Sequence, residues 1–161
     1  MSNLELRLRS DATRLPVDSP VLLLHILSDE FLWGLGFTQS IEARWPQATR
    51  GVQQTLRTEA SRARLGEVLW TPLAGSLVLG HLLAERSRGL AQAELQLDAF
   101  ASCLRHVASA AGATGAVVHA PPLGTGLACA RWSDVRALLE SELVQRGIPV
   151  VIHCLGSQGP S

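Results

Sequence analysis

The sequence Ala120-Pro121-Pro122-Leu123-Gly124-Thr125-Gly126-Leu127-Ala128 connects a short apolar run, residues 115–119, to an amphipathic segment that begins near Arg131. A Gly-x-Gly turn that leaves a strand and enters a helix can direct several backbone N–H groups at one anion. Because two positions lack a Cβ, a phosphate can approach the main chain, and the following helix adds a partial positive charge. The turn therefore predicts an anion site, although tight turns also use glycine for steric reasons alone.

A second glycine turn, Trp33-Gly34-Leu35-Gly36, strengthens this prediction. It follows a continuous apolar run, residues 21–27, which is typical of a strand covered on both faces. It precedes a helical pattern in which Phe37, Ile41 and Trp45 share one face. Ligands of parallel sheets bind outside the carboxyl ends of the strands, where we expect both turns to lie. Two anion-binding turns favour a ligand with two phosphates.

The hydrophobic pattern alternates between strand-like and helix-like segments along the chain. We expect strands over residues 4–8, 21–27, 67–73, 76–83, 116–119 and 149–153, and helices over 37–45, 47–64, 91–111 and 133–145. This order predicts an α/β fold with a mixed, mostly parallel six-stranded sheet and helices on both faces. We expect one domain over residues 1–155 and a flexible C-terminal tail over 156–161.

Composition excludes several classes of function. Apolar residues make up 47% of the chain and the formal net charge is zero, which favours a compact fold and gives no global field to recruit nucleic acid or an acidic membrane. No residue is a lysine, so Schiff-base chemistry, a P-loop lysine and a lysine base are excluded. No apolar run is long enough for a membrane helix, and we expect no membrane partner.

The cysteines and histidines predict neither disulfides nor a metal site. Cys103, Cys129 and Cys154 are odd in number and lack C-x-x-C spacing, which favours reduced thiols in a cytoplasmic protein. The five histidines are scattered without an i, i+4 pair on a helix, so we expect no metal and no cofactor. Four of them lie in strand-like runs, where packing in the core or at a strand end is the expected role: His25, His81, His119 and His153.

The order of these motifs resembles a macrodomain, and within that family the branch of the terminal ADP-ribose glycohydrolases and their actinobacterial relatives. The residues that carry the resemblance are Pro122 to Leu127, with Trp132 six positions after Gly126, and Trp33 to Phe37 with Arg44-Trp45-Pro46 behind it. The resemblance spans roughly residues 6–155. It implies a three-layer macrodomain fold, a bacterial protein and a cleft for ADP-ribose.

The resemblance also implies which residues would contact that ligand. Asp11 would accept a hydrogen bond from the adenine amino group, and the two glycine turns would hold the diphosphate. The full implied set of ligand-binding residues is Asp11, Ala12, Ser28, Trp33, Gly34, Leu35, Gly36, Phe37, Pro122, Leu123, Gly124, Thr125, Gly126, Leu127 and Ala128. The alternatives are that Asp11 only caps a turn and that Trp33 only shields the site.

The chain departs from the branch at its reactive residues. The family pattern has a lysine nucleophile where Ala84 and Glu85 fall here, and an acid just after the second turn where this chain has Ala128. A lysyl mechanism is therefore excluded. Asp29 and Glu30, just before the first turn, are the candidate catalytic residues that would orient a water, although loop carboxylates are usually only solvated.

Two functions from different classes follow from the resemblance. The first is a hydrolase that releases mono-ADP-ribosyl groups from modified side chains or another acceptor, by a substrate-assisted mechanism without lysine. The second is a reader that binds ADP-ribose and catalyses nothing. A third alternative is an oligomeric scaffold with a degenerate cleft. The expected partner is ADP-ribose or an ADP-ribosylated protein, or a nucleic-acid adduct, and we expect a monomer.

Overall fold

The protein is described by a computed structural model that covers residues 4–31, 33, 36–59, 64–89, 92–126, 128 and 130–161. Its strands form a seven-stranded sheet in the order β1-β7-β6-β2-β4-β3, with β5 paired to β4. The strands are β1 (Leu4–Leu8), β2 (Val21–Ser28), β3 (Val68–Ala74), β4 (Leu77–Ser87), β5 (Ala93–Leu95), β6 (Val117–Ala120) and β7 (Val150–Cys154). The neighbouring strands β1, β7, β6, β2 and β4 are all parallel, whereas β3 and β5 run antiparallel to β4.

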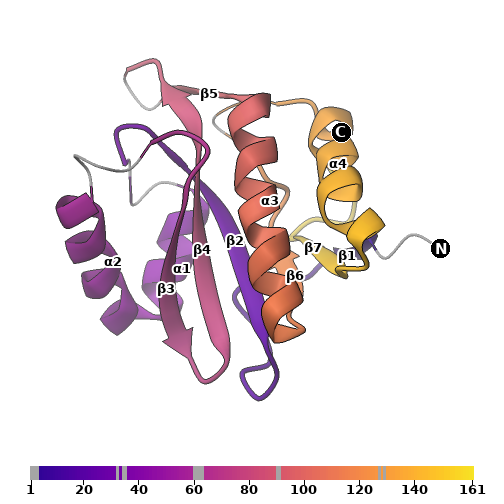
Figure 1. Cartoon of the computed structure of the whole chain (residues 1–161), viewed down its shortest axis with the longest axis horizontal. Coiled ribbons are helices and arrows are strands. Elements are labelled where there is room, and N and C mark those ends of the chain that lie inside the picture. The colour runs from indigo at the N-terminus through magenta and orange to yellow at the C-terminus, as the bar shows by residue number, and fades with distance from the viewer. Residues whose placement is uncertain are drawn as a thin grey trace.

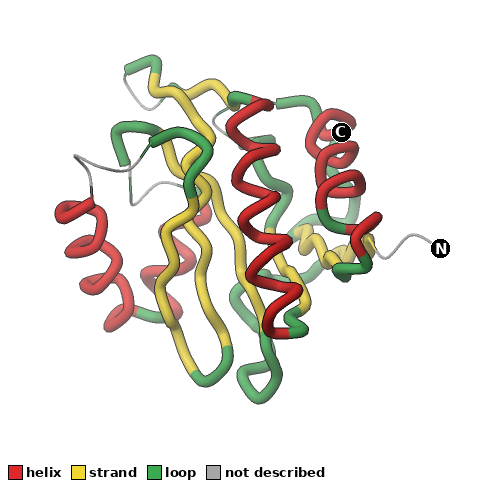
Figure 2. Tube along the Cα trace, viewed as in Figure 1, coloured by secondary structure: helices red, strands yellow, loops and turns green. Residues whose placement is uncertain are grey.

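Helices cover both faces of this sheet, as Figures 1 and 2 show. They are α1 (Phe37–Arg44), α2 (Pro46–Glu59), α3 (Leu97–Thr114) and α4 (Trp132–Glu142), followed by a 3-10 turn at Val144–Arg146. In Figure 1, α3 and α4 lie in front of the sheet and α1 lies behind it. The mostly parallel three-layer α/β prediction is therefore confirmed. No helix among the described residues has the length and hydropathy needed to cross a bilayer.

The central strand β2 explains why the sequence forms two separate cores. Side chains alternate across a strand, so Leu22 and Leu24 face the α3 and α4 side, whereas Val21 and Leu23 face the α1 and α2 side. Both faces are apolar because both are covered, which is why β2 reads as a continuous hydrophobic run. Burial of one such leucine stabilises the fold by about 2 kcal/mol.

Two details of the predicted elements are wrong. The prediction of a helix from residue 91 fails because Ala93–Leu95 forms β5, and α3 begins only at Leu97. The extended end of β4 offers an edge that β5 completes, with Glu85 opposite Leu95, and this tertiary pairing overrides the local helical pattern. The sheet consequently has seven strands and not six. Pro46 does end α1, and it also opens α2 as its first residue, where its missing N–H costs nothing.

Parallel pairing places the functional loops together. Strand β2 lies between β6 and β4, so the carboxyl ends of these three strands meet at one edge of the sheet. The loop after β2 and the turn after β6 carry the first and second glycine motifs, respectively. The predicted tail begins at Gly156, whose carbonyl accepts a hydrogen bond of 2.9 Å from Arg9 N. Its flexibility stays a prediction.

Candidate functional site

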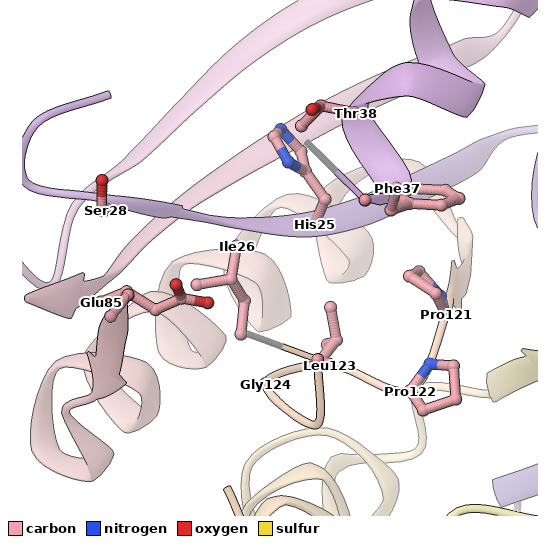
Figure 3. Close-up of a pocket in the computed structure, with 13 residues that line it drawn as sticks. His25, Ile26, Ser28, Phe37, Thr38, Glu85, Pro121, Pro122, Leu123 and Gly124 are labelled. Atoms are coloured by element: carbon pink, nitrogen blue, oxygen red, sulfur yellow. The ribbon is translucent and has the colours of Figure 1, made fainter. Parts of the chain in front are cut away.

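A pocket opens at this edge of the sheet, with a cavity volume of about 180 Å³. Its walls come from the end of β2, the start of α1, the turn after β6 and the β4–β5 corner (Figure 3). The lining residues are His25, Ile26, Ser28, Gly36, Phe37, Thr38, Glu85, Ala93, Pro121, Pro122, Leu123, Gly124 and Gly126. Both glycine motifs thus contribute to one cavity.

The two glycines of the second turn serve different purposes. Gly124 has φ +72°, and a Cβ there would lie 2.9 Å from Leu95 Cδ2, so the packing of β5 against the turn itself requires glycine. Gly126 lies outside the positive-φ region, and a Cβ there would meet no heavy atom within 4 Å. The steric explanation therefore accounts for Gly124 but not for Gly126. At Gly126 the missing side chain leaves the pocket open.

The rest of the second turn is held by its own hydrogen bonds. Thr125 Oγ1 donates to the carbonyl of Pro122 at 2.8 Å, and Ala130 N donates to the carbonyl of Gly124 at 2.8 Å. Thr125 and Ala128 are not among the residues that line the pocket, and Leu127 lies outside the described residues. The predicted hydroxyl contact from Thr125 stays a prediction, since this hydroxyl already has a protein acceptor.

The first turn contributes Gly36 and Phe37 to the opposite wall. Gly36 has φ +58° and precedes the first residue of α1, so its left-handed backbone turns the chain from the loop into the helix. A Cβ at Gly36 would also meet nothing within 4 Å. Gly34 and Leu35 of this motif lie outside the described residues. Gly36 faces the pocket at the positive end of α1, as an anion site needs.

Ser28 and Trp33 have different positions. Ser28, at the end of β2, is buried and lines the pocket. Trp33 packs edge-on against His25 with ring centroids 5.5 Å apart, and its Nε1 donates to Glu42 Oε1 at 2.7 Å. It lines a neighbouring hollow beside α2 and not the pocket itself. In this structure Trp33 shields His25, and stacking on a ligand stays a prediction.

Asp11 stabilises the turn after β1. Its Oδ1 accepts hydrogen bonds from Thr13 N at 2.8 Å and Thr13 Oγ1 at 2.7 Å, and these bonds lower the pKa of Asp11 below its ordinary value. Ala12 is buried beneath it. Neither residue lines the pocket. The turn-capping role is present, and the adenine contact stays a prediction that would use the second oxygen, Oδ2.

The two carboxylates proposed to orient a water bind Ser87 instead. Asp29 Oδ1 accepts from Ser87 N at 2.8 Å, and Glu30 Oε2 accepts from Ser87 Oγ at 3.0 Å. Both are exposed, and neither lines the pocket. These two hydrogen bonds connect the loop after β2 to the end of β4. Because both carboxylates are used in this connection and lie outside the pocket, the geometry does not favour Asp29 or Glu30 as the catalytic pair.

Glu85 is the ionisable group that sequence reasoning missed. It sits near the end of β4, opposite Ser28 of β2, and Figure 3 shows its carboxyl group pointing into the pocket toward Ile26. Burial raises the pKa of Glu85 to about 7. The only signal in the sequence is that Glu85 directly follows a largely apolar run, residues 77–84, and Asp29 follows a similar run, so this signal does not separate the two carboxylates.

The four strand histidines form two buried pairs, so their predicted packing role is confirmed. His25 Nε2 lies 2.6 Å from His81 Nδ1, and His119 Nδ1 lies 2.8 Å from His153 Nε2. Burial lowers the pKa of His81 and of His119 to about 4. Only His25 of the four lines the pocket. Within the described part of the chain no cluster of His, Cys, Asp and Glu could hold a metal ion.

Comparisons with known proteins identify this architecture. No protein-family model matches the chain, and a search of curated proteins found no match. A macrodomain protein from Streptomyces coelicolor is 26% identical, covers 97% of this chain and 99% of its own, and has a TM-score of 0.77. A Bacteroides thetaiotaomicron protein of unknown function is 24% identical, covers 94% and 97% of the two chains, and has a TM-score of 0.83.

A third solved structure contains a ligand. It is DarTG from Thermosipho africanus in complex with ADP-ribose, which is 18% identical to this chain with a TM-score of 0.70 and matches 93% of this chain and 41% of its own. At that identity the likeness is one of fold. The sheet order, the two helical layers and the full-length match to the Streptomyces structure agree with the motifs in the sequence. The chain therefore has the macrodomain fold.

Proposed function

We propose that this macrodomain binds ADP-ribose, with the diphosphate held between the first and second glycine turns. One observation carries the proposal: Gly36 and Gly126, from motifs ninety positions apart in the chain, line the same pocket, and neither glycine is needed to avoid a clash with a protein atom. Backbone N–H groups and the N-terminus of α1 then supply the anion site, which matters in a chain without lysine. The likeness to a solved complex with ADP-ribose supports this choice of ligand.

We further propose that the bound group is hydrolysed from its acceptor. The substrate would be a mono-ADP-ribosyl group on a protein side chain, and an acidic side chain is favoured because its ester linkage is activated. A water held between the diphosphate and the C1″ atom of the terminal ribose attacks, without a lysyl intermediate. Positioning and backbone electrostatics contribute several orders of magnitude to such a reaction. The resemblance to the terminal ADP-ribose glycohydrolases supports this assignment.

A reader without activity is the second candidate function. It is favoured by one specific difference, since Ala128 stands where the resembling branch has an acid after the second turn. Both candidates share the same cleft and the same ligand. Only an assay of release separates them.

Binding is tested by calorimetric titration with ADP-ribose against ADP, AMP and NAD. We expect ADP-ribose to bind most tightly, and absence of heat with all four nucleotides would refute the proposal. Gly126→Glu places a carboxylate in the pocket and should abolish binding through bulk and like charge. Gly112→Glu is the matched control, because Gly112 is an exposed glycine on α3 that does not line the pocket.

Release is tested with a peptide that carries ADP-ribose esterified to a glutamate side chain. We expect turnover by the native chain above the enzyme-free rate and none by Gly126→Glu. Binding of ADP-ribose without turnover on both this peptide and a peptide with a serine-linked group would identify the reader instead.

A further inference from the structure

We propose that Glu85 is the catalytic proton donor of this pocket: its carboxyl group protonates the acceptor oxygen as the bond from that oxygen to C1″ breaks. The inference deepens the proposed function and rests on it. It moves the catalytic role from the loop carboxylates Asp29 and Glu30, which were expected to orient a water, because both are held by Ser87 outside the pocket wall.

The position of Glu85 is fixed by backbone on both sides. Its carbonyl accepts a hydrogen bond of 2.8 Å from Asp29 N, and its strand neighbours are Ser28 of β2 and Leu95 of β5. The side chain therefore starts from a rigid strand and not from a loop, which is how a catalytic group is held in register with a ligand. Figure 3 shows the carboxyl group directed across the pocket toward the wall that carries Gly124.

Glu85 makes no hydrogen bond or ion pair through its side chain with any described residue. A partly buried carboxyl group without a partner is unusual in a fold whose other buried polar groups are largely paired. A structural carboxylate would be expected to have a cation or donors beside it. Glu85 instead faces the open cavity, where the partner it lacks would be supplied by the ligand.

Burial, and not a neighbouring charge, favours the protonated form of Glu85. The ionisable groups on β2, the loop after it, β4 and β5 are His25, Asp29, Glu30, His81, Arg86 and Glu94, and α3, which packs on β4, carries Asp98, Arg105 and His106. None of these groups contributes to the pKa of Glu85, which burial alone raises to about 7. A bound diphosphate adds negative charge to the cavity and raises this pKa further. A bound diphosphate therefore favours the protonated form of Glu85 further.

Glu85 both gives and recovers one proton during hydrolysis, so the reaction balances. The C1″–O bond breaks with its electron pair moving to the acceptor oxygen, which takes the proton from the Glu85 carboxyl group. Water then forms the new C1″–O bond and loses one proton to the Glu85 carboxylate, which regenerates the acid. The products are ADP-ribose with a free 1″-hydroxyl and the unmodified acceptor, and no oxidant, metal or covalent intermediate is required.

The test compares the native chain with Glu85→Gln, in which the amide keeps the shape but cannot donate a titratable proton. Release of ADP-ribose from the serine-linked peptide, whose alkoxide leaving group needs a proton, and from the glutamate-linked peptide is followed from about pH 5 to about pH 9 after subtraction of the enzyme-free rate. We expect kcat of the variant on the serine-linked peptide to fall by about 100-fold or more, with unchanged or tighter binding of ADP-ribose. We also expect the native kcat to decrease on the alkaline side and this decrease to be absent from the residual activity of the variant.

Glu94→Gln is the matched control, because Glu94 lies on the adjacent strand and forms an exposed ion pair with Arg88 outside the pocket. It should leave kcat and the pH profile unchanged. Glu85→Asp keeps the acid on a shorter side chain and should recover part of the activity. Circular dichroism and thermal melting verify that each variant is folded.

The outcomes separate the two proposals. A native chain that hydrolyses the serine-linked peptide together with an equally active Glu85→Gln variant overturns the role of Glu85 and leaves the hydrolase standing. A native chain that binds ADP-ribose but releases none from either peptide overturns both the hydrolase and its acid, and leaves the reader. Loss of ADP-ribose binding in Glu85→Gln, with kcat unchanged at saturation, would mean a binding role only and also overturns the proposal.

Discussion

His25 Nε2 and His81 Nδ1 lie 2.6 Å apart in the centre of the sheet, in direct register between β2 and β4. The second nitrogen of His81, Nε2, lies 2.9 Å from Thr71 Oγ1 on β3, so one polar chain crosses three neighbouring strands. Burial, the main cause, lowers the pKa of both histidines, and each therefore stays neutral in the folded protein. A neutral pair can share one proton in a hydrogen bond, whereas a charged pair would repel.

The histidine pair predicts a loss of stability in mild acid. The pKa of His81 is about 4 in the folded protein, against an ordinary histidine value of 6.5 in the unfolded chain, so the unfolded state binds more protons between these values. Stability is therefore fully present above pH 6.5 and falls as the pH drops toward 4, by up to about 3 kcal/mol from His81 alone. Urea unfolding at a series of pH values measures this slope.

His81→Gln isolates the contribution of the pair. The amide is neutral at every pH, so we expect a shallower acid slope than in the native chain, even though His119 and His153 still contribute. His106→Gln is the control, because His106 is exposed on α3. An identical slope in the native chain and His81→Gln would show that this pair does not govern acid unfolding.

Thr71→Val should destabilise the fold more than the small difference in volume between threonine and valine would suggest. Valine has nearly the same shape as threonine but leaves His81 Nε2 without its partner at 2.9 Å inside the sheet. An unsatisfied buried polar atom costs about 1–3 kcal/mol. Thr71→Ser keeps the hydroxyl group and should lose only the smaller methyl contribution. A chemical denaturation series that finds valine as stable as serine at this position would contradict the hydrogen-bond assignment.

Glu85 predicts a pH effect on stability with the opposite sign. Its folded pKa of about 7 lies above the ordinary value of 4.5, so its contribution to stability is fully present below pH 4.5 and is lost as the pH rises through 7. Glu85→Gln removes this loss. Relative to the native chain, the variant should gain up to about 3 kcal/mol between pH 4.5 and pH 8, or about 2–4 °C of Tm for each kcal/mol.

Melting curves at both pH values test this directly. A constant difference in Tm between Glu85→Gln and the native chain would mean that Glu85 is ionised at neutral pH, which removes the electrostatic basis for an acid at this position. The same measurement on Glu94→Gln should show no comparable trend, because that carboxylate is exposed and paired with Arg88.

The layers of the fold could be predicted from the sequence because β2 can be recognised from its own residues, without knowledge of its neighbours. A run such as Val21–Ser28, which is almost entirely apolar and short, is typical of a strand covered on both faces, and the glycine motifs that follow β2 and β6 mark the sheet edge. Strand β5 could not be predicted in this way. Residues 93–95 have no strand pattern of their own and become a strand only because β4 extends far enough to pair with them.

In the candidate site, too, some features follow from local sequence and others depend on how the strands pair. The glycine turns could be identified from their spacing, because a backbone feature needs only local sequence. Glu85 could not be chosen over Asp29 and Glu30 on sequence alone, since all three are carboxylates near strand ends. What distinguishes them is that Ser87 holds two of them at the surface while the third turns into the cavity, and this depends on the pairing of β2 with β4.

The two glycines of the second turn provide the last prediction, in which stability and binding separate. Gly124→Ala forces a side chain into φ +72° and against Leu95 Cδ2 at 2.9 Å, so it should destabilise the fold by about 1–3 kcal/mol. Gly126→Ala meets no protein atom within 4 Å and should change stability by less than about 0.5 kcal/mol. It should nevertheless weaken ADP-ribose binding, because the new methyl group occupies the approach to the backbone.

Thermal melting measures the change in stability of both variants, and calorimetric titration measures their binding. In a Gly124→Ala background, the additional change Leu95→Ala removes Cδ2, the atom that the new methyl group meets, and should recover part of the lost stability. If Gly126→Ala binds ADP-ribose as tightly as the native chain, then its backbone is not approached by the diphosphate. In that case Gly126 is a turn residue only, and the ligand must lie against another wall of the pocket.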